Sequence, residues 1–117
     1  MRHLEKKGRK FGRKRGPRRH FIKGLLNNLI LEGKIETTLA RAKEIKPRAE
    51  KMITLAKKQD LSALRLLLSR LPKKAAMKLY YEIAPKYKNR RGGYLKIIKT
   101  SKVRKRDGAE LAQIQFI

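Results

Sequence analysis

Apolar side chains recur three and four residues apart in several stretches of the chain, the spacing that gathers them on one side of an α-helix. The first stretch runs from Phe21 to Ile30, and Gly33 follows it as a residue typical of helix C-termini. The second covers residues 39–56. Because proline lacks a backbone donor, Pro47 predicts that this second helix kinks or restarts just before it.

Two shorter helices are predicted in the middle of the chain. Asp60 is placed to cap a helix over residues 61–71, which ends at Pro72. A fourth helix covers residues 75–84, where alanine, leucine, tyrosine and isoleucine share one side, and Pro85 follows it closely. Each of the helices therefore has an apolar side that must be buried against another element.

Three stretches are rich in β-branched or alternating apolar residues and predict strands: residues 34–38, 94–100 and 111–117. Thr37 or Thr38, at the end of the first strand, is placed to cap the helix that follows. Asp107 and Gly108 form a turn signal between the other two strands. We therefore predict an α+β fold, with about four helices packed on one face of a small three-stranded mixed sheet.

The charge of the chain is large and unevenly distributed. The 34 Lys and Arg against 9 Asp and Glu give a formal net charge of +25. Residues 1–19 combine ten of these cations with only three apolar side chains, too few to offset the entropy lost on ordering. We therefore expect an extended basic N-terminal arm over residues 1–19 and a globular α+β domain over residues 20–117. Residues 86–106 hold ten more cations and no acid.

Such a surplus of cations implies a polyanionic partner, and nucleic acid fits best because each neutralised phosphate releases condensed counterions. The chain has no Cys, which removes disulfides, thiolate zinc sites and thiol catalysis together and fits a reducing compartment. No apolar run exceeds three residues, whereas a bilayer span needs about 20. We expect a soluble, cytoplasmic protein without a membrane partner.

The N-terminal arm is the strongest feature of the sequence. Gly8, Gly12 and Gly16 let the backbone approach a surface closely, while long cationic side chains reach phosphates on either side. We expect the arm to insert into folded RNA, and a nuclear localisation tract or a solvated charged tail are the alternative interpretations. The candidate RNA-binding residues of the arm are Arg2, His3, Arg9, Lys10, Phe11, Arg13, Lys14, Arg15, Arg18 and Arg19.

The folded part supplies a second set of candidates. Arg90 and Arg91 are the strongest, because the planar guanidinium pairs with phosphate or guanine through two hydrogen bonds. Tyr87 and Tyr94, which flank them, either stack on RNA bases or pack in the core, and core packing is favoured for Tyr94. The candidate RNA-binding residues of the folded part are His20, Lys23, Arg41, Arg90, Arg91, Lys96, Lys99, Arg104, Lys105 and Arg106.

No constellation in the sequence predicts an enzyme. The two histidines, His3 and His20, have no ligand spacing, and no carboxylate pair lies in an apolar stretch. We expect no catalytic residue, metal, cofactor or small-molecule substrate. The competing class is a DNA-binding architectural protein, which inserts apolar wedges from a β-ribbon. The predicted hairpin tip is rich in Lys and Arg and has only Val103 as an apolar residue, which disfavours DNA.

Four ordered blocks of residues resemble a known family. They are the opening Met1-Arg2-His3, the stretch at residues 35–44, Met52-Ile53-Thr54-Leu55-Ala56-Lys57, and the stretch at residues 90–99. In content and order they are similar to the bacterial large-subunit ribosomal protein L17 family, over essentially the whole chain. The resemblance implies a structural constituent of the 50S subunit that supports translation. It also implies contact with large-subunit ribosomal RNA (rRNA), beside neighbouring ribosomal proteins near the mouth of the polypeptide exit tunnel.

Overall fold

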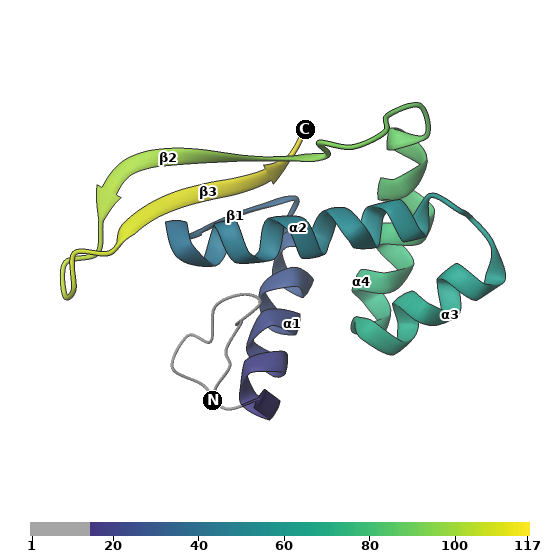
Figure 1. The fold of residues 1–117 in the computed structure, drawn as a ribbon, viewed down its shortest axis with the longest axis horizontal. Coiled ribbons are helices and arrows are strands. Elements are labelled where there is room, and N and C mark those ends of the chain that lie inside the picture. The colour runs from purple at the N-terminus through teal and green to yellow at the C-terminus, as the bar shows by residue number, and fades with distance from the viewer. Residues whose placement is uncertain (1–14) are drawn as a thin grey trace, which may run out of the picture.

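A computed structural model describes residues 15–117 and shows helices gathered on one side of a three-stranded sheet (Figure 1). The α+β fold expected from the sequence is confirmed. In chain order the elements are α1 (Arg15–Glu32), β1 (Lys34–Thr38), α2 (Leu39–Ala56), α3 (Leu61–Arg70), α4 (Lys73–Lys78), the π-helical turn η1 (Leu79–Ile83), the 3-10 turn η2 (Ala84–Tyr87), β2 (Leu95–Val103) and β3 (Glu110–Phe116).

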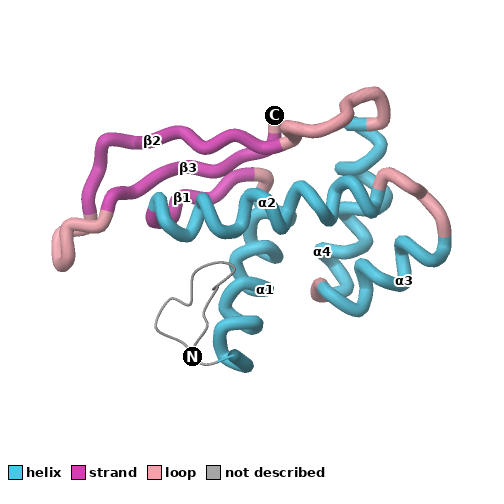
Figure 2. Tube along the Cα trace, in the orientation of Figure 1, coloured by secondary structure: helices cyan, strands magenta, loops and turns pink. Residues whose placement is uncertain are grey.

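The sheet has the order β1-β3-β2, and both pairs of strands are antiparallel. The prediction of a mixed sheet was wrong in this respect. Strands β1 and β2 do run in the same direction, but β3 lies between them and keeps them apart (Figure 2). Ile114 at the centre of β3 pairs with Ile35 on one side and Ile97 on the other. This row faces the helices and forms part of the core.

The predicted capping residues hold the helices in place. The Thr38 hydroxyl accepts a hydrogen bond from the Arg41 backbone N–H at 3.3 Å, and the Asp60 carboxylate accepts one from the Ala63 N–H at 2.7 Å. Both bonds satisfy donors that the first turn of a helix leaves without partners. In contrast, α2 does not restart at Pro47, because it is a continuous helix on both sides of this residue.

The predicted fourth helix continues past Pro85 by changing its geometry. After α4 the chain forms a π-helical turn in which the Ala84 N–H donates to the Leu79 carbonyl. The Tyr80 carbonyl would then need the N–H that Pro85 lacks. The Gln59 side chain donates to this carbonyl instead, at 2.8 Å. A side chain from the α2–α3 connection thus satisfies the acceptor that the proline leaves open.

Helix α2 lies at the centre of the molecule, in contact with the sheet on one side and with α1, α3 and η1 elsewhere (Figure 1). The centre of its apolar side is buried, and Ile45 and Ile53 are both 0% exposed. Tyr94 is 1% exposed, which confirms that it packs in the core. Tyr87 is also buried, against the Tyr94 ring, and its hydroxyl donates to the Ile117 carbonyl at 2.7 Å. Neither ring is available to stack on an RNA base.

Candidate nucleic-acid interface

The candidates in the N-terminal arm divide at the start of α1. Arg2, His3, Arg9, Lys10, Phe11, Arg13 and Lys14 lie outside the described residues. Arg15 and Arg18 belong to the first turn of α1, and Arg19 follows them in the same helix. Residues 15–19 are therefore helical, not extended as predicted. Pro17 is compatible with this position because the first turn of a helix does not use its backbone N–H groups.

Arg90 and Arg91 lie on the loop that joins η2 to β2. Lys57, at the end of α2, fixes this loop by donating hydrogen bonds to the Arg90 carbonyl and to the Tyr94 hydroxyl, the latter at 2.8 Å. The bond from Lys57 lowers the pKa of Tyr94. Arg90 itself donates from Nε to the Gly92 carbonyl at 3.1 Å, and Arg91 is exposed. The loop therefore presents its arginines on a backbone that is held to the core.

Arg104, Lys105 and Arg106 lie at the tip of the β2–β3 hairpin, which projects beyond the helices (Figure 1). Asp107 organises the tip, because its carboxylate accepts hydrogen bonds from the Arg104 guanidinium and, at 3.2 Å, from the Ala109 N–H. The bond from Arg104 holds the pKa of Asp107 below its ordinary value. The predicted turn is confirmed, and it leaves Lys105 and Arg106 exposed.

Lys96 and Lys99 share strand β2 but lie on opposite faces of the sheet, because they are three residues apart in a strand. Lys96 lies on the face away from the helices, in register with Gln115 and Lys34. Lys99 lies in register with the buried Ala112, on the face toward the helices, yet it is itself exposed. One flat RNA surface does not reach both lysines.

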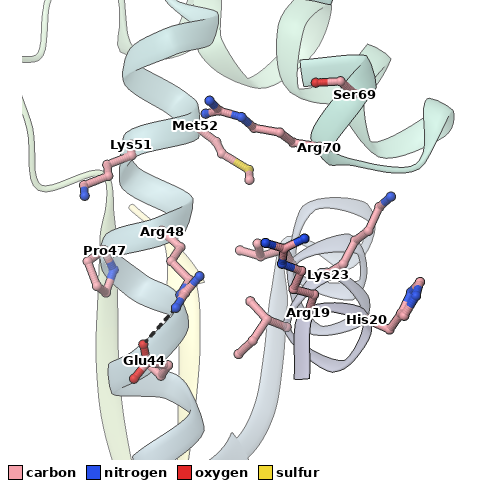
Figure 3. A pocket seen from close by; sticks show the side chains of 12 residues that line it. Arg19, His20, Lys23, Glu44, Pro47, Arg48, Lys51, Met52, Ser69 and Arg70 are labelled. Atoms are coloured by element: carbon pink, nitrogen blue, oxygen red, sulfur yellow. Dashed lines mark hydrogen bonds and ion pairs between the residues drawn. The ribbon is translucent and has the colours of Figure 1, made fainter. Parts of the chain in front are cut away.

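A groove of about 930 Å³ lies between α1, α2 and the C-terminal end of α3 (Figure 3). Its rim carries the predicted candidates Arg19, His20 and Lys23 together with three cations that the sequence analysis missed. These are Arg48 and Lys51 from α2 and Arg70 from α3. Figure 3 shows the Arg19 and Arg70 side chains extending from α1 and α3 toward the space beside Met52.

The groove combines its cationic rim with an apolar wall. Ile22 and Leu26 of α1 line it from one side, and the partly buried Met52 of α2 lines it from the other. Its acidic lining residue, Glu44, is 7% exposed and receives a hydrogen bond from Arg48 at 3.5 Å. The rim therefore stays cationic.

Arg41 is held differently from the other candidates. Its guanidinium carbon lies 4.8 Å from the centroid of the Phe21 ring, a cation–π contact that joins α2 to α1. The side chain is only partly exposed. Arg41 therefore stabilises the packing of two helices, a role that the sequence analysis did not foresee.

The missed cations had weak signals in the sequence. Arg48 and Lys51 are three residues apart and so lie on neighbouring positions of α2, which marks an exposed basic side of that helix. Arg70 lies on the same groove as these two residues only because of the way α3 packs in the folded protein, and the local sequence does not specify that packing. Lys57 is 37 residues from Tyr94, so no local pattern connects the two.

Comparison with known proteins agrees with this picture. The family whose sequence model matches the chain is Ribosomal protein L17, and the match covers residues 21–117. The chain belongs to the ribosomal protein L17 family.

Curated relatives cover the L17-family chain almost completely. A protein of Sulfurihydrogenibium sp. is 45% identical over 118 residues, which cover 100% of this chain and 97% of the relative. A protein of Clostridium acetobutylicum is 46% identical over 93% of this chain and 96% of its own length. A protein of Bdellovibrio bacteriovorus is 48% identical over 92% of this chain, but the match spans only 59% of that longer protein. Each relative is named large ribosomal subunit protein bL17.

In the described residues of this L17-family chain, exposed cations lie at the groove rim, at the loop at residues 90–91 and at the hairpin tip, and others, among them Lys96 and Lys99, lie elsewhere on the surface. Among residues 15–117, His, Asp and Glu do not gather into a group of three or more that would suit a metal ion. Within the same residues, no helix has the length and apolarity needed to cross a bilayer. The exposed cations at these surfaces are suited to binding anions.

Proposed function

We propose that the chain binds large-subunit rRNA as a non-catalytic, structural constituent of the large (50S) ribosomal subunit and thereby supports translation. The observation that carries the proposal is the wide distribution of exposed cations over one small domain, including the groove rim, the loop at residues 90–91, the hairpin tip and β2, in a chain of net charge +25. The large subunit enters the proposal from the relatives, because their names assign them to that subunit. The resemblance noted from the sequence supports a position near the mouth of the exit tunnel, in the cytoplasmic ribosome.

In this proposal, affinity comes from neutralised phosphates and specificity from the shape of the RNA. The domain contributes rigid contacts, because the loop at residues 90–91 and the hairpin tip are both fixed by hydrogen bonds within the protein. Residues 1–14, the part of the predicted arm that precedes α1, contribute further phosphate contacts by inserting into the RNA. The partners are large-subunit rRNA and neighbouring ribosomal proteins, and no membrane or small-molecule substrate takes part.

The test compares the full chain with a variant that lacks residues 2–14, the part of the predicted arm that precedes α1. The binding of each protein to large-subunit rRNA is measured in filter-binding assays at several salt concentrations. The deletion is expected to leave the circular dichroism spectrum helical and to flatten the salt dependence, by about 0.7–0.9 log unit for each phosphate that the arm no longer neutralises. An unchanged salt slope would remove the arm from the proposal.

Duplex DNA serves as the competitor in the same assay. The proposal requires that folded large-subunit rRNA displaces the protein from duplex DNA of equal phosphate concentration. If the two nucleic acids compete equally, the chain is a general polyanion binder, and the architectural DNA-binding class gains support.

A further inference from the structure

The groove between α1, α2 and α3 is more than a cationic surface. Its lining joins an apolar wall, formed by Ile22, Leu26 and Met52, to a rim of positive charge. Phosphate neutralisation alone needs no apolar wall. The groove therefore suits a ligand with an anionic part beside an apolar part.

An unpaired nucleotide of RNA has these two parts. Its base offers an apolar face once it leaves the stack, and its phosphates carry the charge. A base-paired duplex keeps its base faces stacked and offers only phosphates to the rim. We infer that this groove holds one unpaired nucleotide of the rRNA, an inference that rests on the proposed function.

The residue types of the rim favour a nucleotide over a simple phosphate site. Arg19, Arg48 and Arg70 come from three different helices, and a guanidinium both pairs with phosphate through two hydrogen bonds and stacks on a base. Figure 3 shows Arg19 and Arg70 approaching the space from opposite sides, with Met52 beside them. In this arrangement a base would rest against Met52, with Arg19 and Arg70 as the guanidinium groups that bind it or its phosphate.

The groove is large enough for this occupant. A volume of about 930 Å³ lies at the upper end of the range, about 300–1,000 Å³, that is typical of sites for small ligands. Glu44, the acid of the lining, is nearly buried and accepts a hydrogen bond from Arg48, so little negative charge opposes an incoming phosphate. An acidic protein segment is the other occupant that the charge would accept, but the apolar wall beside three arginines favours a base.

The test is base-specific chemical probing of the large-subunit rRNA of the protein's own source, alone and bound to the full-length protein. Arg70→Gln removes a rim cation, and Met52→Gln replaces the thioether with an amide on a side chain of similar length. Arg65→Gln is the matched control, because Arg65 is exposed on α3 but does not line the groove. The melting temperature of each variant shows whether the fold is kept.

We expect the wild-type protein and Arg65→Gln to protect at least one unpaired nucleotide that Arg70→Gln and Met52→Gln leave reactive. Met52→Gln should lower the affinity by up to about tenfold without changing the salt slope, since it removes apolar contact only. Arg70→Gln should reduce the slope by about 0.7, the value for one neutralised phosphate of single-stranded RNA.

Two outcomes would overturn the inference while the proposed function stands. One is salt-dependent binding with the same protected nucleotides in all four proteins. The other is binding of a poly-glutamate peptide that is abolished in Arg70→Gln while the rRNA protection stays unchanged, which would assign the groove to an acidic protein segment. The proposed function itself fails if the wild-type protein shows no salt-dependent binding to the rRNA, or if duplex DNA competes equally with the rRNA.

Discussion

Lys57 is the residue whose removal most directly tests how the arginine loop is held. Its ammonium group donates to the Arg90 carbonyl and to the hydroxyl of Tyr94, which is 1% exposed. Lys57→Met keeps most of the aliphatic stem and removes both bonds. A hydrogen bond that involves a charged group contributes about 1.5–3 kcal/mol. Because Lys57 is partly exposed and Tyr94 retains its own bond to the Arg90 carbonyl, the destabilisation should lie near the lower end of that range.

The assay is urea denaturation followed by circular dichroism, with Lys58→Met as the matched control. Lys58 is the exposed neighbour, so its change should shift the free energy of unfolding by less than about 0.5 kcal/mol. A double-mutant cycle with Tyr94→Phe isolates the bond itself, with an expected coupling of about 1 kcal/mol. Equal destabilisation by Lys57→Met and Lys58→Met, or a coupling near zero, would refute the argument that Lys57 fixes the loop.

Two further predictions concern the sheet. Ile114→Ala should destabilise the protein by about 2–5 kcal/mol in urea denaturation because Ile114 is fully buried, whereas Ile98→Ala on the neighbouring strand, 43% exposed, should cost less than about 1 kcal/mol. Equal costs would mean that the centre of β3 is not buried. Because Arg104 lowers the pKa of Asp107, the order that this carboxylate gives the hairpin tip should persist above pH 4 and be lost as the pH falls through the lowered value. An NMR titration should show the pKa of Asp107 rising toward its ordinary value in Arg104→Gln, and an unchanged pKa would contradict this cause.

Local patterns in the sequence predicted those features whose cause is also local. Thr38 and Asp60 cap the helices that follow them because a side-chain oxygen and a backbone N–H three residues on meet without help from the rest of the fold. The first strand was predicted with its observed bounds, Lys34–Thr38, from its β-branched residues and the glycine before it.

Features that depend on distant partners were not predicted correctly. The continuation of the fourth helix past Pro85 needs Gln59, which supplies the missing donor from another part of the chain. The mixed sheet was a wrong prediction because periodicity states which face of a strand is buried, not which strands are neighbours. The groove needs the C-terminal end of α3 to face α1 across α2, and the positions of Arg48, Lys51 and Arg70 in the sequence contain no sign of that arrangement.

The middle strand of the sheet, β3, pairs with β1, which is far from it in the sequence and is therefore synthesised much earlier. Roughly 70 residues separate Thr38 from its partner Leu111, so at about 5–20 residues per second a ribosome needs about 4–14 s to deliver β3 after β1. Until β3 is synthesised, the backbone groups through which β1 pairs with β3 have no partner in the sheet. The helices α1–α4 all precede β3 in the chain, and both ladders of the sheet need β3 as a partner.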